Sequence, residues 1–587
     1  MPYTTSPEID FSAIGLMVDV PANAVPTGGW SNSLNVRCRN GSVQGVNKFE
    51  DNSLAGGIVL YDSGTIITNG KAMAVCQFTP AGATDLVIAY IVKGTDNNGH
   101  VILYDTGTST WDDITSVVAN QIFTFNDSYP PQIFVFNELL IVNPGTDAPP
   151  QYTTAAVGAG SLQELPNWAY DVTGVETNTI TDTKFYTITT LGDTTQAQWE
   201  TAGLTAGVTA YLGLRFTAAN TTTIGGTTGR VKLSHPVISR VVRPFNNRLV
   251  AMNILEEHGA GTSDDVSLPV DFLWSSHITS IASITETDWT AASTNTAGDA
   301  FLTDTPGRIL DGGQLGEYFI AYKADSVVRV RETGDDFVLA FESIFEDDGI
   351  YSTRCFANIG SSQHLVVGNY GVYIHDGQSQ KQDIAKDLFK DTMYALVPPS
   401  RKDRAFVFQQ TRDKEVWLCL STTGNNTGAL GCDLAFVYNY EDKKIHKRSL
   451  PGLSDIFETE LDGVLKIYAA KPDDTKLQVL SNTLLESGGY FERTDDNLTD
   501  NSRVKCINRV HVNAKGACLI ALTGTQNLSD SKSYTNVTFN PVTDYKIDSR
   551  VSGRYMNLKV TMTDSLGVAI NPELTKLQFD IKIMGVR

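Results

Sequence analysis

The sequence is poor in charge and in histidine, and it lacks the motifs that commonly mark a catalytic or metal site. Only 19% of the 587 residues are charged. No G-x-S-x-G, P-loop, H-E-x-x-H, Ca²⁺-loop spacing or helix-opening G-x-G-x-x-G occurs. The eight histidines are scattered, and none stands at metal-ligand spacing from another: His100, His235, His258, His277, His364, His375, His446 and His511. We therefore expect no metal, no cofactor and no catalytic residues.

Paired cysteines are also missing. The seven cysteines are odd in number and form no C-x-x-C, which argues against a zinc ribbon or a redox motif. Most alternate with apolar residues, as in WLCLS around Cys419, so we expect buried, reduced thiols in a protein assembled in a cytoplasm. The first residues carry neither a basic nor an apolar run, so we expect no signal peptide. No apolar run is long enough to span a membrane.

Positive charge is in short supply. Lys and Arg number 45 against 66 Asp and Glu, which gives a formal net charge of -21. A protein that grips nucleic acid by its phosphates needs the opposite sign. An acidic surface serves solubility, or forms a wall along which a polyanion slides without sticking. The most basic stretch, RVVRPFNNR at 240–248, is expected to make ion pairs between blades or subunits.

The sequence is rich in short apolar strands joined by polar turns. This hairpin phrase recurs at 134–143, 245–254, 315–330, 361–377, 404–420 and 433–449. Hairpins that return every few dozen residues are typical of β-propeller blades. Abundant Thr, Asn, Ser and Gly suit exposed strand faces and turns. The fold class predicted is all-β, with a β-propeller core.

Changes of amino-acid composition and of hydrophobic pattern divide the chain into four parts. Residues 1–160 are predicted to hold an N-terminal arm and the first blades, including a hairpin that turns at Asn40-Gly41. The Thr- and Gly-rich residues 161–234 indicate an inserted small β domain, and residues 235–485 the remaining blades. Residues 486–587 alternate like strands of a β-sandwich. The best helix candidate is Gln382–Leu396, with apolar residues near helical spacing.

Carboxylates offer the one candidate site. Two acidic clusters stand close together: Asp335 and Asp336, and then Glu342, Glu346, Asp347 and Asp348. Paired carboxylates on a propeller could hydrolyse glycosides if one acid had a raised pKa and faced the other. A solvated acidic loop is the plainer interpretation. A loop that faces a channel is the third.

Three stretches, in this order, resemble one protein family. They are GLMVDVPANAVPTGGWSNSLNVRCRNGSVQGVNKF at 15–49, the phrases HLVVGNYGVYIHDG and FVYNYEDKKIHKRSLPG in the blades, and FNPVTDYKIDSRVSGRYMNLKVTM at 539–562. Residues 185–231 are similar to a small module inserted in many phage virion proteins. Together these stretches resemble the tail nozzle or hub proteins of short-tailed bacteriophages, also called tail tubular protein B.

The resemblance implies a structural virion protein rather than an enzyme. Such proteins form a homo-hexameric nozzle below the portal and the adaptor, in the tail of a virion assembled in the host cytoplasm. The ring surrounds the exit channel, where it gates and guides viral DNA without sequence-specific binding, and fibres or spikes dock outside. In this setting residues 343–351, with the acidic residues named above, become the candidate channel or gate loop.

Two other functions stay open on the sequence. One is a carbohydrate-binding or glycoside-hydrolysing β-propeller, against which the cysteines and the missing signal peptide count. The other is a phage baseplate or fibre-anchoring protein without a channel.

Overall fold

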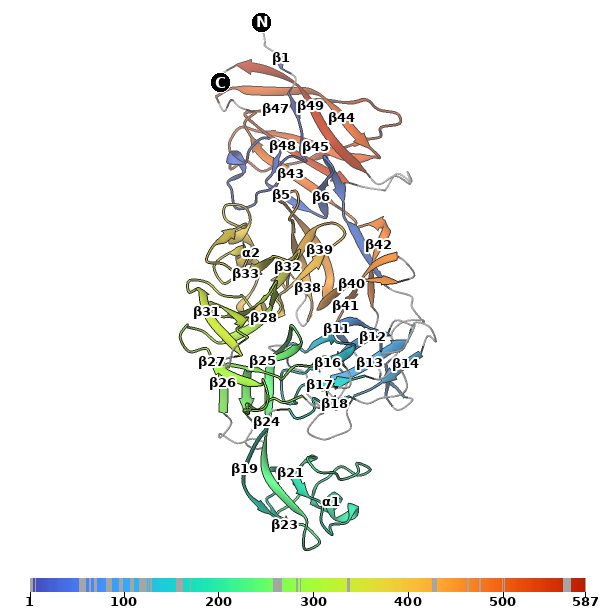
Figure 1. Ribbon diagram of the computed structural model, residues 1–587. Coiled ribbons are helices and arrows are strands. Elements are labelled where there is room, and N and C mark those ends of the chain that lie inside the picture. Colours follow the sequence, from blue (N-terminus) through green and yellow to red (C-terminus); the bar gives the residue numbers. More distant parts are fainter. Residues whose placement is uncertain are drawn as a thin grey trace.

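Three bodies follow one another along the molecule (Figure 1): a β-sandwich, a β-propeller and a small β module. The computed structural model describes residues 4–5, 7–51, 60–62, 65–67, 71–80, 87–93, 99–105, 110–115, 124, 126, 129–154, 162–168, 170–256, 266–280, 283–284, 287–334, 338–424, 430–461, 464–473, 477–498, 500, 502–562 and 572–585. The described termini both lie on the sandwich, at the end far from the module. The all-β fold class predicted from the sequence is confirmed.

The propeller has seven four-stranded antiparallel blades, whose first strands lie nearest the axis. Blades 1 to 3 are β11–β14 (Lys71–Phe78, Val87–Lys93, Gly99–Asp105, Thr110–Asp113), β15–β18 (Gln132–Phe136, Leu139–Asn143, Gln151–Thr153, Gln163–Glu164) and β24–β27 (Arg230–Phe245, Arg248–Glu256, Val266–Trp274, Gly298–Phe301). Blades 4 to 6 are β28–β31 (Ile309–Leu315, Tyr318–Lys323, Val327–Glu332, Leu339–Phe345), β32–β35 (Phe356–Ile359, Gln363–Val367, Val372–His375, Lys381–Asp383) and β36–β39 (Phe406–Gln410, Glu415–Leu420, Cys432–Asn439, Lys444–Leu453).

Blade 7 closes the ring with strands from both ends of the chain. Its strands are β40 (Asp455–Leu461), β41 (Val464–Ala470), β42 (Gln478–Leu485) and, outermost, the N-terminal β8 (Asn47–Asp51). Blade 7 meets blade 1 through several hydrogen bonds, one of which runs from Thr459 Oγ1 to Gln77 Oε1. Val75 N donates to Asp455 Oδ2 at 3.0 Å, and Ser454 Oγ donates to the Ala72 carbonyl at 3.3 Å. The pairing of the N-terminal β8 with β42 ties the ring shut, because separating these two strands would leave an unpaired edge on each of them.

The small module is inserted before blade 3. Its elements are β19 (Tyr170–Thr177), β20 (Thr179–Ile180), β21 (Phe185–Thr190), α1 (Gln196–Ala202), β22 (Arg215–Thr217) and β23 (Thr222–Thr223). It has its own buried core around Trp199 and Phe216. The expected boundary at residue 234 falls inside β24, since that strand begins in the module and continues as the inner strand of blade 3.

The sandwich is built from both ends of the chain. One sheet contains β47 (Lys546–Gly553), β44 (Val504–Lys515), β49 (Glu573–Gly585), β7 (Ser42–Gly45) and β6 (Val36–Arg39), with β1 (Thr4–Thr5) and β2 (Glu8–Ile9) beside β49. The other contains β46 (Thr535–Phe539), β45 (Cys518–Thr525), β48 (Tyr555–Met562), β43 (Tyr490–Asp496) and β5 (Asn32–Leu34). The N-terminal arm is therefore part of the sandwich as well as of blade 7.

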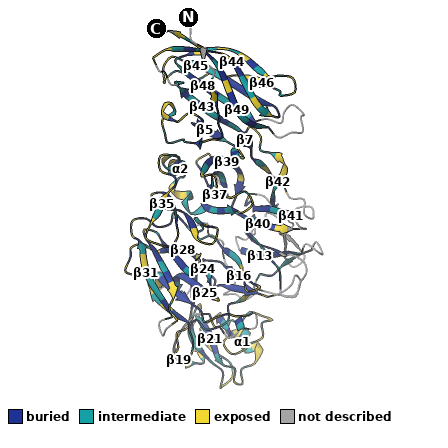
Figure 2. Cartoon of the chain, turned by 45° about the horizontal axis from the view of Figure 1, so that its top comes forward, coloured by how far each residue is buried: buried dark blue, intermediate teal, exposed yellow. Residues whose placement is uncertain are grey.

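One buried core runs from the sandwich into blades 4 to 6, so the two bodies are packed as a unit (Figure 2). In the sandwich, the fully buried Trp30 stacks on Phe491 at 5.1 Å, and its Nε1 donates to the Phe11 carbonyl at 2.8 Å. Trp30 belongs to β4 (Gly29–Trp30), which pairs with β3 (Gly15–Leu16), and η1 (Ala22–Ala24) lies between them. The seven cysteines are free, and five of them are buried.

The hairpins predicted from the sequence are present. Asn137 and Glu138 both have positive φ in the turn between β15 and β16, and so do Asn40 and Gly41 between β6 and β7. Two left-handed residues give the turn whose twist matches that of antiparallel strands.

The predicted helix over residues 382–396 is wrong for its first half. Only α2, Lys390–Leu396, is helical, and η5 (Pro399–Arg404) follows. Asp383 Oδ1 accepts hydrogen bonds from the amides of Ala385 and Lys386, and Asp387 has a φ of 59°. These local bonds compete with helical ones and hold the segment in a turn.

Candidate functional site

The acidic residues singled out in the sequence lie on blade 4 and do not form one cluster. Asp335 and Asp336 fall outside the described residues. Glu342 lies on β31, the outermost strand of the blade, and is exposed. Its carboxylate accepts a hydrogen bond from Arg329 at 2.6 Å, and that bond lowers the pKa of Glu342 below its ordinary value. Glu342 is thus an ionised side chain on the rim of the propeller.

The connection from blade 4 to blade 5 holds the other three carboxylates. Glu346 is exposed and accepts a hydrogen bond from Ser343 Oγ at 3.2 Å, and Asp347 pairs with Lys381 of blade 5 at 2.8 Å. Asp348 is buried and accepts a hydrogen bond from the Asn369 amide at 2.9 Å; burial raises its pKa. Asp348 therefore anchors this connection to blade 5, while Glu346 and Asp347 face outward.

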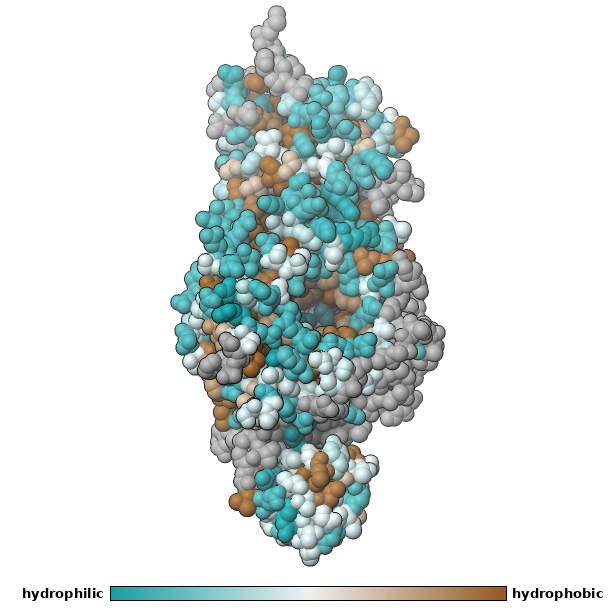
Figure 3. Space-filling view, viewed as in Figure 1, coloured by the Kyte–Doolittle hydropathy of each residue, from teal (hydrophilic) through white to brown (hydrophobic). Residues whose placement is uncertain are grey.

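Near the propeller axis, charged side chains join blades that are distant in sequence. Asp311 of blade 4 is fully buried and receives two hydrogen bonds from Arg243 of blade 3, at 2.9 and 3.0 Å. The Arg354 amide also donates to Asp311, at 2.7 Å, while the Arg354 guanidinium lies 3.6 Å from Asp455 of blade 7. The ion pairs expected for residues 240–248 are thus formed between blades. Figure 3 shows a hollow over the centre of the propeller.

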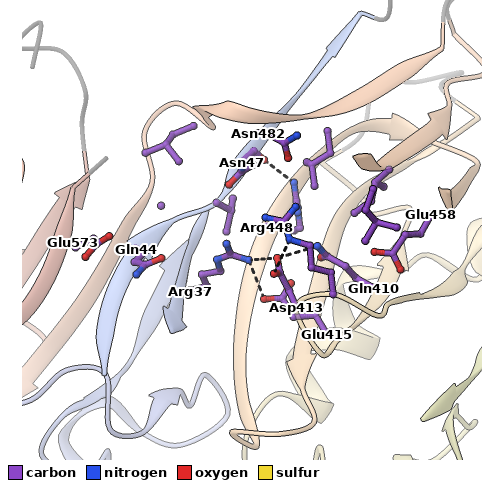
Figure 4. Close-up of a pocket in the computed structure, with 17 residues that line it drawn as sticks. Arg37, Gln44, Asn47, Gln410, Asp413, Glu415, Arg448, Glu458, Asn482 and Glu573 are labelled. Carbon is purple, nitrogen blue, oxygen red and sulfur yellow. Dashed lines mark hydrogen bonds and ion pairs between the residues drawn. The ribbon is translucent and has the colours of Figure 1, made fainter. Parts of the chain in front are cut away.

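A polar cavity of about 210 Å³ lies where the sandwich meets blades 6 and 7 (Figure 4). Arg37 of β6 donates to Asp413 at 2.9 Å and to Glu415 at 3.4 Å. Burial would raise the pKa of Asp413, but Arg37 and Arg39 outweigh it and hold that pKa below its ordinary value. At Glu415 burial prevails over Arg37, and the pKa is raised.

Arg448 lies deeper in the same cavity. It is 3% exposed, and its guanidinium stacks over the Trp417 ring at 4.0 Å. One of its terminal nitrogens donates to the Asn47 carbonyl at 2.9 Å. No carboxylate of the described chain lies within ion-pair distance, and burial lowers the pKa of Arg448 to about 10. Arg448 is therefore a buried cation held mainly by aromatic rings and a carbonyl.

Sequence reasoning missed this cavity. Arg37 belongs to the N-terminal phrase noted above, but nothing in its spacing points to residues 413, 415 or 448. Cavity formation depends on the return of the chain's first residues to blades 6 and 7, which no local pattern encodes.

The acidic excess is confined to the propeller. Residues 486–587 contain 13 Lys and Arg and 11 Asp and Glu, residues 170–234 contain four and five, and residues 1–45 contain two and three. These segments, which form the sandwich and the small module, come close to electrical balance. The propeller segments consequently carry the whole net charge of -21.

Within the described ranges, no three His, Cys, Asp or Glu side chains are grouped so that they could hold a metal ion. The helices described there are also too short or too polar to cross a membrane.

Comparisons with known proteins give little further information. No family model and no curated protein matches the chain. Among solved structures, the Pan2 WD40 domain of Neurospora crassa is similar with a TM-score of 0.31 and 6% identity, over 71% of this chain and 98% of that one. Assignment of a propeller rests on the strand order and ring closure described above.

Proposed function

We propose that this chain is a structural subunit of the tail nozzle of a short-tailed bacteriophage, where six copies surround the DNA exit channel. The observation that carries the proposal is the segregation of charge: a propeller that bears the net charge of -21 stands between two nearly balanced modules. A channel wall of that sign repels phosphate, so DNA passes without adhering. The resemblance of the N-terminal, blade and C-terminal phrases supports the same role.

The architecture is suited to a subunit of a tail nozzle. The sandwich and the propeller share one core, and the first 51 residues tie both together, so force along the molecule is borne by packed sheets. In this proposal one end module binds the adaptor ring and the other contacts fibres or spikes. The ring closes by cyclic symmetry, with one side of each subunit against the opposite side of its neighbour. Assembly takes place in the host cytoplasm.

Glu342, Glu346 and Asp347 are the exposed members of the candidate channel loop. Replacing them together by Gln, Gln and Asn removes three negative charges per copy without touching the buried Asp348. We expect particles with this variant to package DNA normally but to release it more slowly, and more so at low salt, where phosphate repulsion reaches farther. Single-particle fluorescence of released DNA measures the rate.

The matched control neutralises three carboxylates of the sandwich: Asp548, which is exposed, and Asp500 and Asp530, which are partly exposed. Unchanged release from both variants would contradict the channel role of the blade 4 residues.

A further inference from the structure

The strand β46 forms a free edge of the sandwich (Figure 2). It pairs with β45 on one side, and no strand of the described chain pairs with its other side. Such an edge presents unpaired main-chain N–H and C=O groups, to which another extended chain can bind. The opposite edges of the two sandwich sheets, β5 and β6, are instead packed against β39 of blade 6. The free side of β46 is therefore open to a strand from outside.

This edge lacks the usual protection against pairing. Edge strands are commonly guarded by charged residues, by proline or by a bulge. The outer strands of all seven blades contain charged residues, and so does β47, which ends the other sandwich sheet. In contrast, β46 reads Thr-Asn-Val-Thr-Phe, and its pairing with β45 is regular. Four of its five residues are exposed.

The core of the sandwich is incompletely covered at the same edge. Val537 lies directly opposite Ile520, a core residue that is 2% exposed, so Val537 belongs to the inner face of its sheet. Val537 is nevertheless 42% exposed. The turn after β46 also exposes Val542 and Tyr545, at 81% and 73%. Hydrogen bonds from the amides of residues 543 and 544 to the Asn540 carbonyl fix this turn. A further strand on this edge would cover Val537.

We propose that β46 pairs antiparallel with β46 of a second copy of this chain. A pairing centred on Val537 places Val537 opposite Val537, and Asn536 opposite Thr538. No charges oppose each other, and the amide of Asn536 can hydrogen-bond to the hydroxyl of Thr538 across the pair. The sandwich is also where two copies repel each other least, because its segments are nearly balanced while the propeller carries the charge of -21.

The symmetry of this pair separates it from the ring. A two-fold pair uses the same patch of both copies, whereas a ring closed by cyclic symmetry uses two different patches. The β46 pair is therefore formed by free chains and is not a contact within the nozzle ring. In the pair, each copy covers the apolar edge of the other before assembly. The inference goes beyond the nozzle role and does not depend on it.

The test is sedimentation velocity of the full chain and of three double variants, over a range of concentrations. Asn536→Lys with Thr538→Lys places like charges opposite each other across the pair. Asn536→Asp with Thr538→Lys places opposite charges there. The matched control, Asn508→Lys with Asn513→Lys, adds the same charge at exposed residues of β44, an inner strand of the other sheet. Circular dichroism melting verifies that each variant is folded.

We expect the unaltered chain to exchange between monomer and dimer with a Kd in the micromolar range, because the interface is small. The double lysine variant should dimerise about tenfold more weakly or less, since like charges opposite each other oppose strand pairing. The aspartate–lysine variant should still dimerise, and more weakly as salt is raised. The control should behave like the unaltered chain.

Two results would show that the proposal is wrong. One is a chain that stays monomeric at the highest concentration reached. The other is a dimer that the double lysine variant leaves intact, since such a dimer would use a surface other than β46.

Discussion

At the scale of the residue, a histidine–tyrosine chain between blades 4 and 5 is the clearest case of buried polar groups that satisfy one another. Tyr322 Oη lies 2.7 Å from His364 Nδ1 and 2.8 Å from His375 Nε2. His364 Nε2 lies 3.1 Å from the Gln314 carbonyl, and the Gly377 amide donates to His375 Nδ1. A carbonyl only accepts, so His364 carries its proton on Nε2.

The proton positions of the rest of the chain follow. His375 Nδ1 accepts from an amide, so its proton is on Nε2 and is donated to Tyr322, whose hydroxyl donates to His364. With both imidazoles neutral, each ring nitrogen of His364 and His375 has a hydrogen-bond partner. Burial lowers the pKa of His364 to about 4 and that of His375 to about 3. Protonation of either ring would place a second donor against a donor.

This network predicts a loss of stability in mild acid. Between a pH of about 6.5 and about 4 the unfolded chain binds protons on these histidines while the native chain does not, so the free energy of unfolding falls as pH falls. We expect His364→Gln, which keeps a donor and an acceptor, to remove one of the two contributions. Urea denaturation at pH 7 and pH 4.5 should show a loss smaller by roughly 2 kcal/mol in the variant. Equal losses in the two proteins would refute the neutral network.

The candidate acidic site could be predicted from the sequence only in part. Adjacent carboxylates signalled an acidic connection, and Glu346 and Asp347 do lie there, exposed. The burial of Asp348 and the pairing of Glu342 could not be foreseen, because Asn369 belongs to the turn between β33 and β34 and Arg329 lies opposite Glu342 on the neighbouring strand β30. Contacts made in the fold, and not local charge, decide which of these carboxylates is buried and which are exposed.

At the scale of the element, the hairpins were predictable and the partners of the first strands were not. Alternation and the Asn40-Gly41 turn encode the β6–β7 hairpin locally. Nothing local shows that β8 pairs with β42, with Phe49 opposite Leu480. The chain leaves the sandwich for blade 7 at Val46, within a single residue between β7 and β8. Such long-range pairings depend on closing the whole ring, which the sequence pattern does not reveal.

The small module should be removable. Thr173 of β19 and Leu233 of β24 are directly paired, so a two-residue Asn-Gly turn can join them in place of residues 174–232. The module has its own core, so we expect the shortened chain to fold and to melt within a few degrees of the full chain. Differential scanning calorimetry measures this.

A matched deletion of residues 1–51 should behave differently, because it removes the outer strand of blade 7 and several strands of the sandwich. That chain is expected to be insoluble or to lack a cooperative transition. A shortened module variant that also fails to fold would show that the module supports the propeller.

At the scale of the whole molecule, one rigid body carries an uneven distribution of charge. The sandwich and the propeller are fixed together by a shared core and by the N-terminal strands, and the acidic excess is carried by the propeller between two balanced ends. An all-β class and a propeller followed from composition and repetition. Three other features could be found only from the three-dimensional structure. They are the number of blades, the pairing of the N-terminal β8 with β42, and the course of β24 from the small module into blade 3.

The most direct test of the nozzle role is electron microscopy of particles that contain this chain, with the tail reconstructed first without symmetry and then with six-fold averaging. The account predicts six copies around an axial channel, with the propellers lining it and the sandwich or the small module meeting the ring above. Absence of the chain from the tail, or a monomeric subunit placed away from any channel, would contradict it.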